Sequence, residues 1–269
     1  MLAMNKGAVG YLVLVLVITG TTRCSLTKDP VRGEVQELLD ELERKDESVY
    51  STGGTSYSEE MNRLIEIGEP AVPLLVRRLR ELQKPSYHGK FIDADTAIVV
   101  VLGDIRDPAA TEVLLDIAKK WGLSTGPAVE ALGKIGGRIV EGPKGYEGFE
   151  EVVDFLEELY VRSLTPRRWG SFVEELRAWE HLYVVETLVS IGSDEYHKMT
   201  RPYILPILIC AAGDKYRSFG GAETAVEALR RWTGQDFGHD SIRWAEWWKQ
   251  NYRHPEWKDS EAMPPCTTE

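Results

Sequence analysis

The chain contains few cysteines, and their spacing matches neither a metal site nor a disulfide framework. Cys24, Cys210 and Cys266 are the only three among 269 residues. Structural zinc sites and small disulfide-stapled domains need four or more cysteine or histidine ligands, or an even cysteine set at short spacing. Cys210 lies in an apolar segment, so we expect a buried, inert thiol there. A Cys210–Cys266 bridge is the alternative if the protein is exported.

Basic charge is scarce too. The chain has 32 Lys and Arg against 43 Asp and Glu, which gives a net charge of −11. Nucleic-acid binders normally present a basic face, because neutralising phosphates supplies much of their affinity. The main basic cluster, Arg77, Arg78 and Arg80, is interpreted as a solvated helix flank. We therefore expect no nucleic-acid partner.

Recognisable catalytic motifs are absent. The glycine pairs lack the strand and Lys-Ser/Thr context of a phosphate-binding loop, and no pattern assembles a triad or paired carboxylates. Isolated candidates have ordinary structural explanations, such as Asp95 as a helix N-cap and Glu186 facing water or pairing with a neighbouring helix. We predict no catalytic residue, no cofactor and no metal. The weak candidates are His88, Asp93, Asp95, Glu186, and His239 beside Asp240.

Alternating strand patterns are missing, whereas apolar residues recur at helical spacing. Val35, Leu38, Leu39 and Leu42 form an i, i+3, i+4, i+7 stripe, which is typical of an amphipathic helix. The short Val-rich run at 97–105 is better explained as a buried helix because of its place in a repeat. The predicted fold class is therefore all-α.

One unit of sequence recurs along the chain. The stretch "LIEIGEPAVPLLVRRL" (64–79) reads as a helix end, a glycine stop, a proline restart and a second helix. Glycine tolerates the left-handed conformation past a helix end, and proline is harmless in a first turn. Asp107 before Pro108 predicts an N-cap for another restart. Similar helix ends recur about every 41 residues, within the range of helical hairpin repeats. They begin at Leu64, Leu102, Leu132, Leu188 and Leu229.

The pattern Leu-x-x-Ile-Gly followed by Pro-Ala-Val-Pro-Leu-Leu resembles a HEAT repeat of the short bacterial type, also found in phycobilisome-lyase-like proteins. The segment 228–251, "ALRRWTGQDFGHDSIRWAEWWKQN", is similar to a closing segment of such arrays in exported bacterial proteins. The resemblance covers roughly 59–251. It implies an armadillo-type fold, an irregular α-solenoid of antiparallel helical hairpins with a Trp-rich C-terminal capping helix.

Solenoids need atypical terminal helices, because an end repeat exposes the apolar face that a missing neighbour would cover. For the last helix we predict that Asp240 or Ser241 caps its start. The residues predicted to face inward are Ile242, Ala245, Trp248 and Tyr252, with Trp244 and Trp247 beside them. The alternative is an aromatic platform for a sugar or peptide, built from Trp169, Trp179, Trp244 and Trp247.

The N-terminal segment differs from the rest. A basic start, "MLAMNK", precedes an uncharged run at 7–22, which Arg23 ends. Sixteen helical residues span roughly 24 Å, short of the roughly 30 Å hydrocarbon core of a bilayer. A signal peptide or membrane anchor is therefore predicted. Cys24 is a candidate lipidation site, although Arg23 stands where the lipoprotein motif has a small residue.

Four regions are expected: a signal or anchor at 1–28, a helix and flexible loop at 29–58, a HEAT-like domain at 59–254, and a disordered tail at 255–269. The predicted function is a non-enzymatic scaffold that binds a protein partner outside the cytoplasm or in the cell envelope. Only the N-terminal segment would contact the membrane. The alternatives are a lyase or glycosylase type of enzyme on a HEAT-like fold, and a carbohydrate-binding or structural envelope module.

Overall fold

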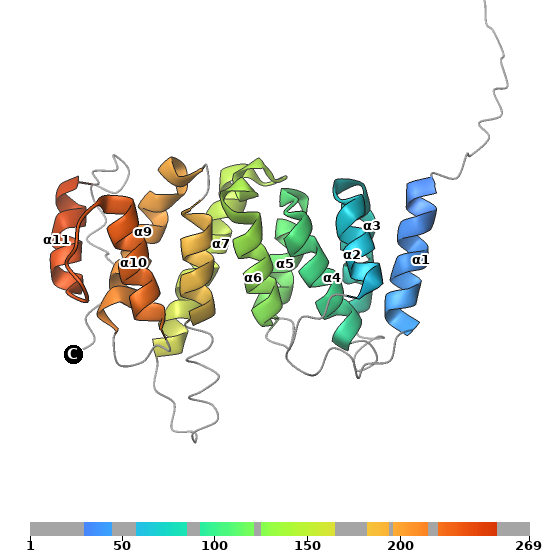
Figure 1. The fold of residues 1–269 in the computed structure, drawn as a ribbon, viewed down its shortest axis with the longest axis horizontal. Coiled ribbons are helices and arrows are strands. Elements are labelled where there is room, and N and C mark those ends of the chain that lie inside the picture. The colour runs from blue at the N-terminus through green and yellow to red at the C-terminus, as the bar shows by residue number, and fades with distance from the viewer. Residues whose placement is uncertain are drawn as a thin grey trace, which may run out of the picture.

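The protein is helical throughout the part that can be described. A computed structural model describes residues 30–44, 58–84, 92–120, 125–164, 182–193, 196–214 and 220–251, and these ranges contain no strand. The prediction of an all-α fold is confirmed (Figure 1). Within these ranges, every helix is too short or too polar to cross a membrane.

Helices succeed one another with short connections. Their bounds are α1 (Pro30–Arg44), α2 (Glu59–Ile67), α3 (Val72–Leu82), α4 (Ile92–Ile105), α5 (Thr111–Lys119), α6 (Thr125–Ile135), α7 (Gly145–Leu164), α9 (His197–Gly213), α10 (Gly221–Thr233) and α11 (Ser241–Asn251). Residues 182–191 form a further helix between α7 and α9. Short 3-10 helices precede α3, α5 and α7, and these are η2 (Glu69–Ala71), η4 (Pro108–Ala110) and η5 (Gly136–Glu141). The same order of helix, 3-10 turn and helix therefore recurs along the chain.

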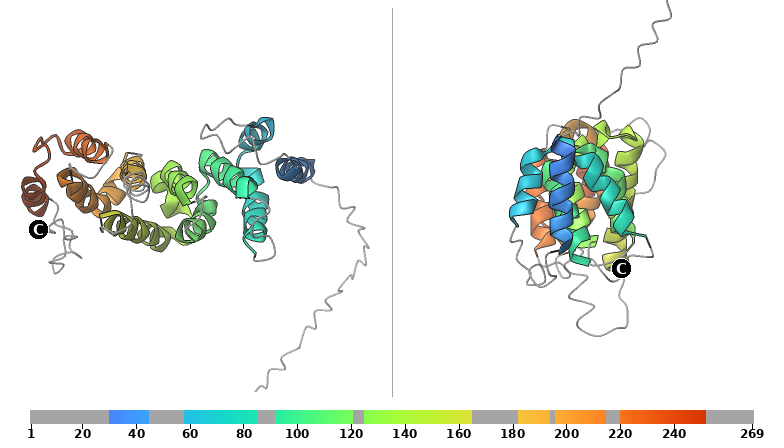
Figure 2. Two further views of the ribbon diagram at one scale, coloured as in Figure 1. Left: turned by 90° about the horizontal axis from the view of Figure 1, so that it is seen from below. Right: turned by 90° about the vertical axis from the view of Figure 1, so that its right-hand side faces the viewer.

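The helices stand in a row that follows chain order along the longest axis of the molecule (Figure 1). Seen from below, the row has two layers (Figure 2). What we call the first layer contains α2, α4, α6, 182–191 and α10, and the second layer contains α3, α5, α7, α9 and α11. Helix α1 packs on α2 and α3 at one end. Contacts of α4 with α6 and of α5 with α7 run along the layers, and those of α5 with α6 join them.

Local chemistry explains where α2 stops and α3 starts. The Ser58 hydroxyl caps α2 by accepting a hydrogen bond from the Met61 amide at 3.3 Å. At the other end Gly68 has a φ of +71°, and its amide donates to the carbonyl of Leu64. Pro70 lies in η2, where its missing N–H costs nothing. The predicted glycine stop and proline restart are confirmed.

The next restart uses an aspartate. Asp107 accepts a hydrogen bond from the Ala109 amide at 2.8 Å, directly before Pro108 opens η4. This confirms the predicted N-cap. The residue before it, Arg106, has a φ of +59° and is the non-glycine residue with positive φ in the described ranges. A left-handed backbone costs a side chain-bearing residue roughly 1–2 kcal/mol, so this turn is strained.

Exchanging glycine and side chain at these two turns should have opposite effects. We expect Arg106→Gly to raise the free energy of unfolding by about 0.5–1 kcal/mol, because relief of strain exceeds glycine's extra unfolded-state entropy. Gly68→Ala should lower it by about 1 kcal/mol. An added Cβ at Gly68 would meet nothing closer than the Ile65 carbonyl oxygen at 3.8 Å, so backbone conformation alone is tested.

Urea unfolding followed by circular dichroism at 222 nm measures both changes. If both variants shift stability in the same direction, the left-handed backbone does not limit these turns.

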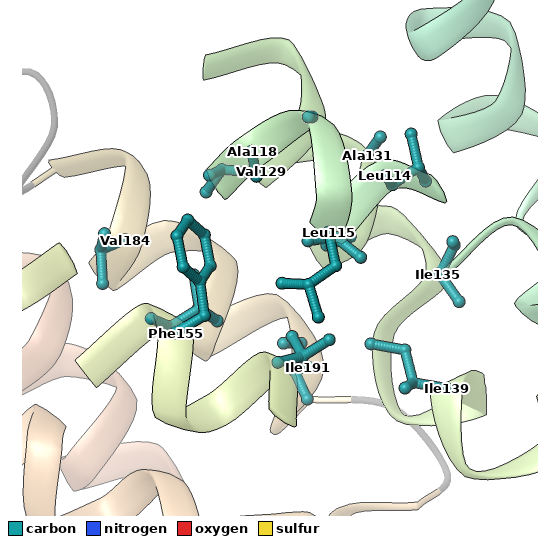
Figure 3. Packing of buried hydrophobic residues seen from close by; sticks show 14 of the residues in the cluster. Leu114, Leu115, Ala118, Val129, Ala131, Ile135, Ile139, Phe155, Val184 and Ile191 are labelled. Atoms are coloured by element: carbon teal, nitrogen blue, oxygen red, sulfur yellow. The ribbon is translucent and has the colours of Figure 1, made fainter. Parts of the chain in front are cut away.

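One apolar core runs from Val35 in α1 to Trp244 in α11. Figure 3 shows part of it, with side chains such as Leu115 of α5, Phe155 of α7 and Ile191 in one cluster. All three are buried. Burial of apolar surface stabilises by roughly 25 cal/mol per Å², and each helix obtains it from the helices that it packs against. The predicted stripe of α1 is confirmed, and the Val-rich run at 97–105 is indeed the buried helix α4.

Glycines let the helices of the first layer approach closely. A Cβ on Gly103 of α4 would lie 2.7 Å from the Cβ of Ala131 on α6. One on Gly133 of α6 would lie 3.2 Å from the backbone of Thr187. Gly103 and Gly133 follow the leucine of two recurring helix ends, Leu-Gly-Asp-Ile and Leu-Gly-Lys-Ile. The repeated glycine therefore lies at the contact with the next helix of the first layer.

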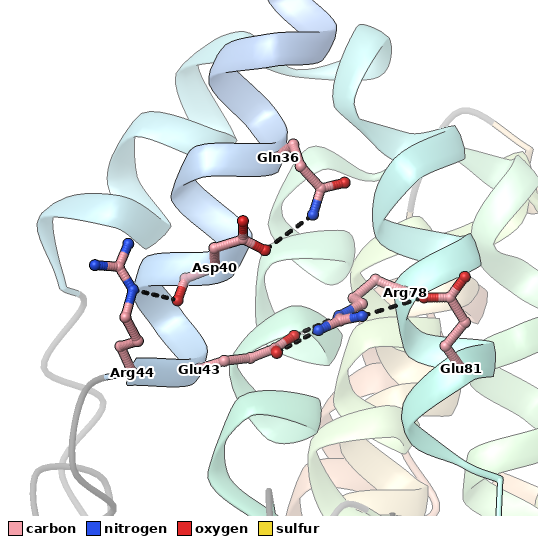
Figure 4. A network of polar contacts seen from close by, with 6 residues as sticks. All are labelled: Gln36, Asp40, Glu43, Arg44, Arg78 and Glu81. Carbon is pink, nitrogen blue, oxygen red and sulfur yellow. Dashed lines mark hydrogen bonds and ion pairs between the residues drawn. The ribbon is translucent and has the colours of Figure 1, made fainter.

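Ion pairs connect neighbouring helices. Arg78 of α3 donates to both carboxylate oxygens of Glu43 on α1 and to Glu81 at 3.2 Å (Figure 4). The hydrogen bonds to Glu43 raise the pKa of Arg78 further, despite its partial burial. Arg80 pairs with Glu112 of α5 at 2.9 Å. The interpretation of this basic cluster as a solvated flank is therefore wrong for Arg78, whose side chain is 21% exposed and bridges to α1, whereas Arg77 and Arg80 are exposed.

Two glutamates of α7 should affect stability with opposite sign. Glu151 accepts hydrogen bonds from Lys144 and Lys119, each at 2.9 Å, and these bonds lower its pKa. Burial, together with the charge of Asp154, raises the pKa of Glu157. Above about pH 4.3, the ordinary pKa of a glutamate, the charged form of Glu151 therefore stabilises the fold. This stabilisation is lost as the pH falls through the lowered pKa of Glu151 in the folded protein. The charged form of Glu157 destabilises the fold at neutral pH, and that penalty vanishes below about pH 4.3.

We expect Glu151→Gln to lower the free energy of unfolding at pH 7 by about 0.5 kcal/mol, the size usual for partly exposed pairs. Glu157→Gln should raise it at pH 7 and leave it unchanged near pH 4. Thermal unfolding of both variants between pH 3 and 8 provides the measurement. Equal shifts of the two variants at every pH would contradict these assignments.

Candidate functional site

A groove of about 360 Å³ lies between α6 and the helix 182–191. Both of these helices belong to the first layer. Its lining residues are Glu130, Gly133 and Lys134 of α6, and Tyr183, Glu186, Thr187 and Ser190 of the facing helix. The volume falls at the small end of the range for ligand pockets, enough for one or two side chains of a partner.

The floor of the groove is closed by hydroxyl groups. Thr187 donates to the Val129 carbonyl at 3.3 Å, and Ser190 donates to the Gly133 carbonyl at 2.8 Å. Gly133 allows this closeness because it has no side chain between the two helices. Both hydroxyls are engaged with backbone oxygen, and the lining contains no histidine or cysteine. Neither hydroxyl is therefore paired with a histidine base in this lining.

Lys134 holds one wall in place. Its ammonium lies 2.9 Å from a carboxylate oxygen of Asp104 on α4 and 3.0 Å from one of Glu130. Burial disfavours the charged form of Lys134, but the hydrogen bonds to Asp104 and Glu130 outweigh burial and raise its pKa. Lys134 is therefore a permanently charged link between α4 and α6.

The opposite wall offers side chains that are not engaged. Glu186 is exposed, and so is Tyr183 with 38% of its surface accessible. Neither makes a hydrogen bond or ion pair within the part of the chain that the structure describes. The groove lining carries two carboxylates, Glu130 and Glu186, and one ammonium, Lys134, which leaves a net charge of −1. A carboxylate beside an aromatic ring favours a cationic side chain as ligand. The sequence left two alternatives for Glu186, facing water or pairing with a neighbouring helix. In the structure it faces water.

Other candidates from the sequence lie apart from the groove. His239 places Nδ1 2.9 Å from the Ala212 carbonyl oxygen, and Asp240 accepts from the Arg243 amide at 3.0 Å. Asp240 thus caps α11, as predicted. The described residues contain no cluster of three or more histidine, cysteine, aspartate or glutamate side chains that could hold a metal.

The N-cap prediction for Asp95 is wrong. Helix α4 begins at Ile92, so Asp95 lies inside it and Asp93 does too. The helix starts earlier than predicted because Ala94 is buried in the core when it is part of α4. Burial of its apolar side chain favours this longer helix. Asp95 instead accepts a hydrogen bond from the Thr96 hydroxyl at 3.4 Å. His88 lies outside the described residues.

The rotation predicted for the last helix is also wrong. Trp244 is fully buried, whereas Ile242 is 66% exposed. The loop before α11 explains this: Phe237 packs edge-on against Trp244 with ring centroids 4.8 Å apart, and the Gly238 carbonyl accepts the Trp244 indole N–H at 2.8 Å. Ala245, Trp247 and Trp248 are partly buried beside it.

A fully buried Trp244 cannot stack on a sugar ring, which removes one member of the alternative aromatic platform. Trp169, Trp179 and Tyr252 lie outside the described residues. The same holds for the uncharged run 7–22 and for Cys24, so the signal and lipidation predictions stay predictions.

Cys210 differs from expectation. It lies in α9 with 6% of its surface exposed, and it is disulfide-bonded rather than a free thiol. The predicted burial is confirmed, whereas the predicted free thiol is wrong.

The described fold defines an all-helical protein whose helices form a two-layered row. No protein-family model matches the chain, and comparisons with curated proteins and with solved structures give no match either.

The groove floor should depend on glycine at position 133. A Cβ there would lie 3.2 Å from Cα, Cγ2 and Oγ1 of Thr187. We expect Gly133→Ala to push the two helices apart and to lower the free energy of unfolding by about 1–2 kcal/mol, as overpacking does. Gly126→Ala in the same helix meets nothing within 4 Å and should raise it by about 0.5 kcal/mol.

Chemical denaturation of the two variants side by side tests this contrast. A Gly133→Ala protein as stable as Gly126→Ala would show that the helices do not require this close approach.

Proposed function

We propose that the chain is an irregular α-solenoid of antiparallel HEAT-like hairpins, and that it acts as a non-enzymatic scaffold for a protein partner. The order of helix, 3-10 turn and helix recurs at α2–α3, α4–α5 and α6–α7, which supports a repeat architecture. Stacking of successive helices in chain order supports it as well. Repeat arrays of this kind present extended surfaces for recognition.

The groove between α6 and 182–191 carries the proposal. It holds an unengaged carboxylate, Glu186, and an exposed phenol, Tyr183, on a rigid floor. Preorganised, unsatisfied groups of this kind bind a ligand without first breaking internal contacts. The charge of −1 on the groove lining and the chain's net charge of −11 favour a partner segment with exposed lysine or arginine.

The scaffold is proposed to lie outside the cytoplasm or in the cell envelope. The basic start and uncharged run at 1–22 are typical of a signal peptide or short anchor. The disulfide of Cys210 supports an oxidising compartment, because thiols are kept reduced in the cytosol. Only the N-terminal segment is proposed to contact the membrane.

Charge reversal in the groove tests the proposal. We expect Glu186→Lys to weaken binding of basic peptides about tenfold, equal to about 1.4 kcal/mol. Glu227→Lys on α10 is a matched control, because Glu227 is also exposed on the first layer and makes no hydrogen bond or ion pair within the described ranges. An array of basic, neutral and acidic 12-residue peptides measures the binding, and added salt should weaken it.

The same three proteins serve as baits for envelope fractions. A partner retained by wild type and Glu227→Lys but lost from Glu186→Lys supports the groove. Equal capture by all three, together with peptide binding that ignores charge, overturns it.

A further inference from the structure

The polar side chains that line the groove between α6 and 182–191 offer mainly hydrogen-bond acceptors. The exposed Ser190 hydroxyl donates its only hydrogen to the Gly133 carbonyl at 2.8 Å, so its lone pairs remain to accept. Glu130 uses one carboxylate oxygen for Lys134 at 3.0 Å, and its other oxygen has no partner among the described residues. The Glu186 carboxylate is unengaged within the same ranges. A cation with several N–H donors therefore matches this lining.

The ammonium of Lys134 does not fill this role. Lys134 is the one basic residue among the described residues that line the groove, and its side chain is 26% exposed. It bonds Asp104 of α4 at 2.9 Å. Because α4 and 182–191 lie on opposite sides of α6 in the row (Figure 1), this bond directs the ammonium toward α4. Glu186 is thus left for a cation from a partner.

An exposed aromatic ring lies beside the unengaged carboxylate. Tyr183 precedes Glu186 by three residues on one helix, so their Cβ atoms are about 5–6 Å apart on the same face. The Tyr183 side chain is 38% exposed, and no aromatic ring or cation of the described residues contacts it. A cation that binds Glu186 therefore meets the face or edge of this ring.

The groove is proposed above to bind a basic segment of a protein partner, and the present inference rests on that function. We propose that the groove selects arginine over lysine in that segment. The planar guanidinium lies against the Tyr183 ring and donates two parallel N–H bonds to Glu186, with further N–H groups directed at Ser190. A volume of about 360 Å³ admits one such side chain.

Lysine fits the same lining less well. Its ammonium is a compact, strongly hydrated charge, whereas the guanidinium is more weakly hydrated and loses less on leaving water. Three tetrahedral donors cannot form the paired bonds to one carboxylate that a planar fork forms, and they do not stack on a ring. The net charge of the two side chains is equal, so the difference between them comes from shape and hydration.

Peptides that differ at one position test the preference. A dye-labelled, otherwise uncharged 12-residue peptide carries arginine, lysine or citrulline at its centre, and its binding to the full chain is measured by fluorescence anisotropy. Citrulline has nearly the shape of arginine but no charge. We expect the arginine peptide to bind about tenfold more tightly than the lysine peptide, equal to about 1.4 kcal/mol, and the citrulline peptide to bind most weakly.

Variants of Tyr183 test whether the ring is the source of the preference. Tyr183→Phe keeps the ring and should keep the preference, whereas Tyr183→Leu should bring the two affinities close together. Tyr146→Leu on α7 is the matched control, because Tyr146 is 42% exposed and lies outside the groove lining. An arginine preference that survives in Tyr183→Leu contradicts the proposed stacking.

The outcomes separate this inference from the proposed function. If arginine and lysine peptides bind wild type equally and both weaken with Glu186→Lys, the acidic groove stands and the arginine preference is overturned. If neither peptide binds wild type, the groove is not a site for basic segments, and both proposals are overturned together.

Discussion

The close approach of neighbouring helix backbones is the interaction on which this structure depends. No helix of the row can bury its apolar side chains alone, so each must be covered by its neighbours. Because Gly103 and Gly133 have no side chain, α4 can approach α6 closely and α6 can approach the helix 182–191 closely. Because packing energy falls steeply with small gaps, this closeness lets one core continue from Val35 to Trp244.

The same packing creates the surface features proposed to matter for function. Where Gly133 draws two helices together, the longer side chains beside it stand apart and leave a groove. Interhelical pairs engage several basic residues, Arg78, Arg80 and Lys134 among them. Acidic side chains outnumber basic ones, so carboxylates such as Glu186 remain to face water. The groove is thus acidic because basic side chains such as Lys134 are paired with carboxylates between helices, whereas Glu186 is not.

The C-terminal end meets a different requirement, because α11 has a neighbour on one side only. Trp244 of α11 is fully buried, and its indole N–H donates to the Gly238 carbonyl in the preceding loop. This packing strengthens the place where an array of helices would otherwise fray.

Local interactions were readable from the sequence by itself: the apolar periodicity of the helices, the stop at Gly68, and the caps at Asp107 and Asp240. Each depends on residues within a few positions of one another, which the chain order already specifies. The rotation of α11, the extra turn of α4, the partners of Arg78 and the groove were decided by the tertiary structure. They depend on side chains that are tens of residues apart and meet only when the helices pack, so no local pattern encodes them.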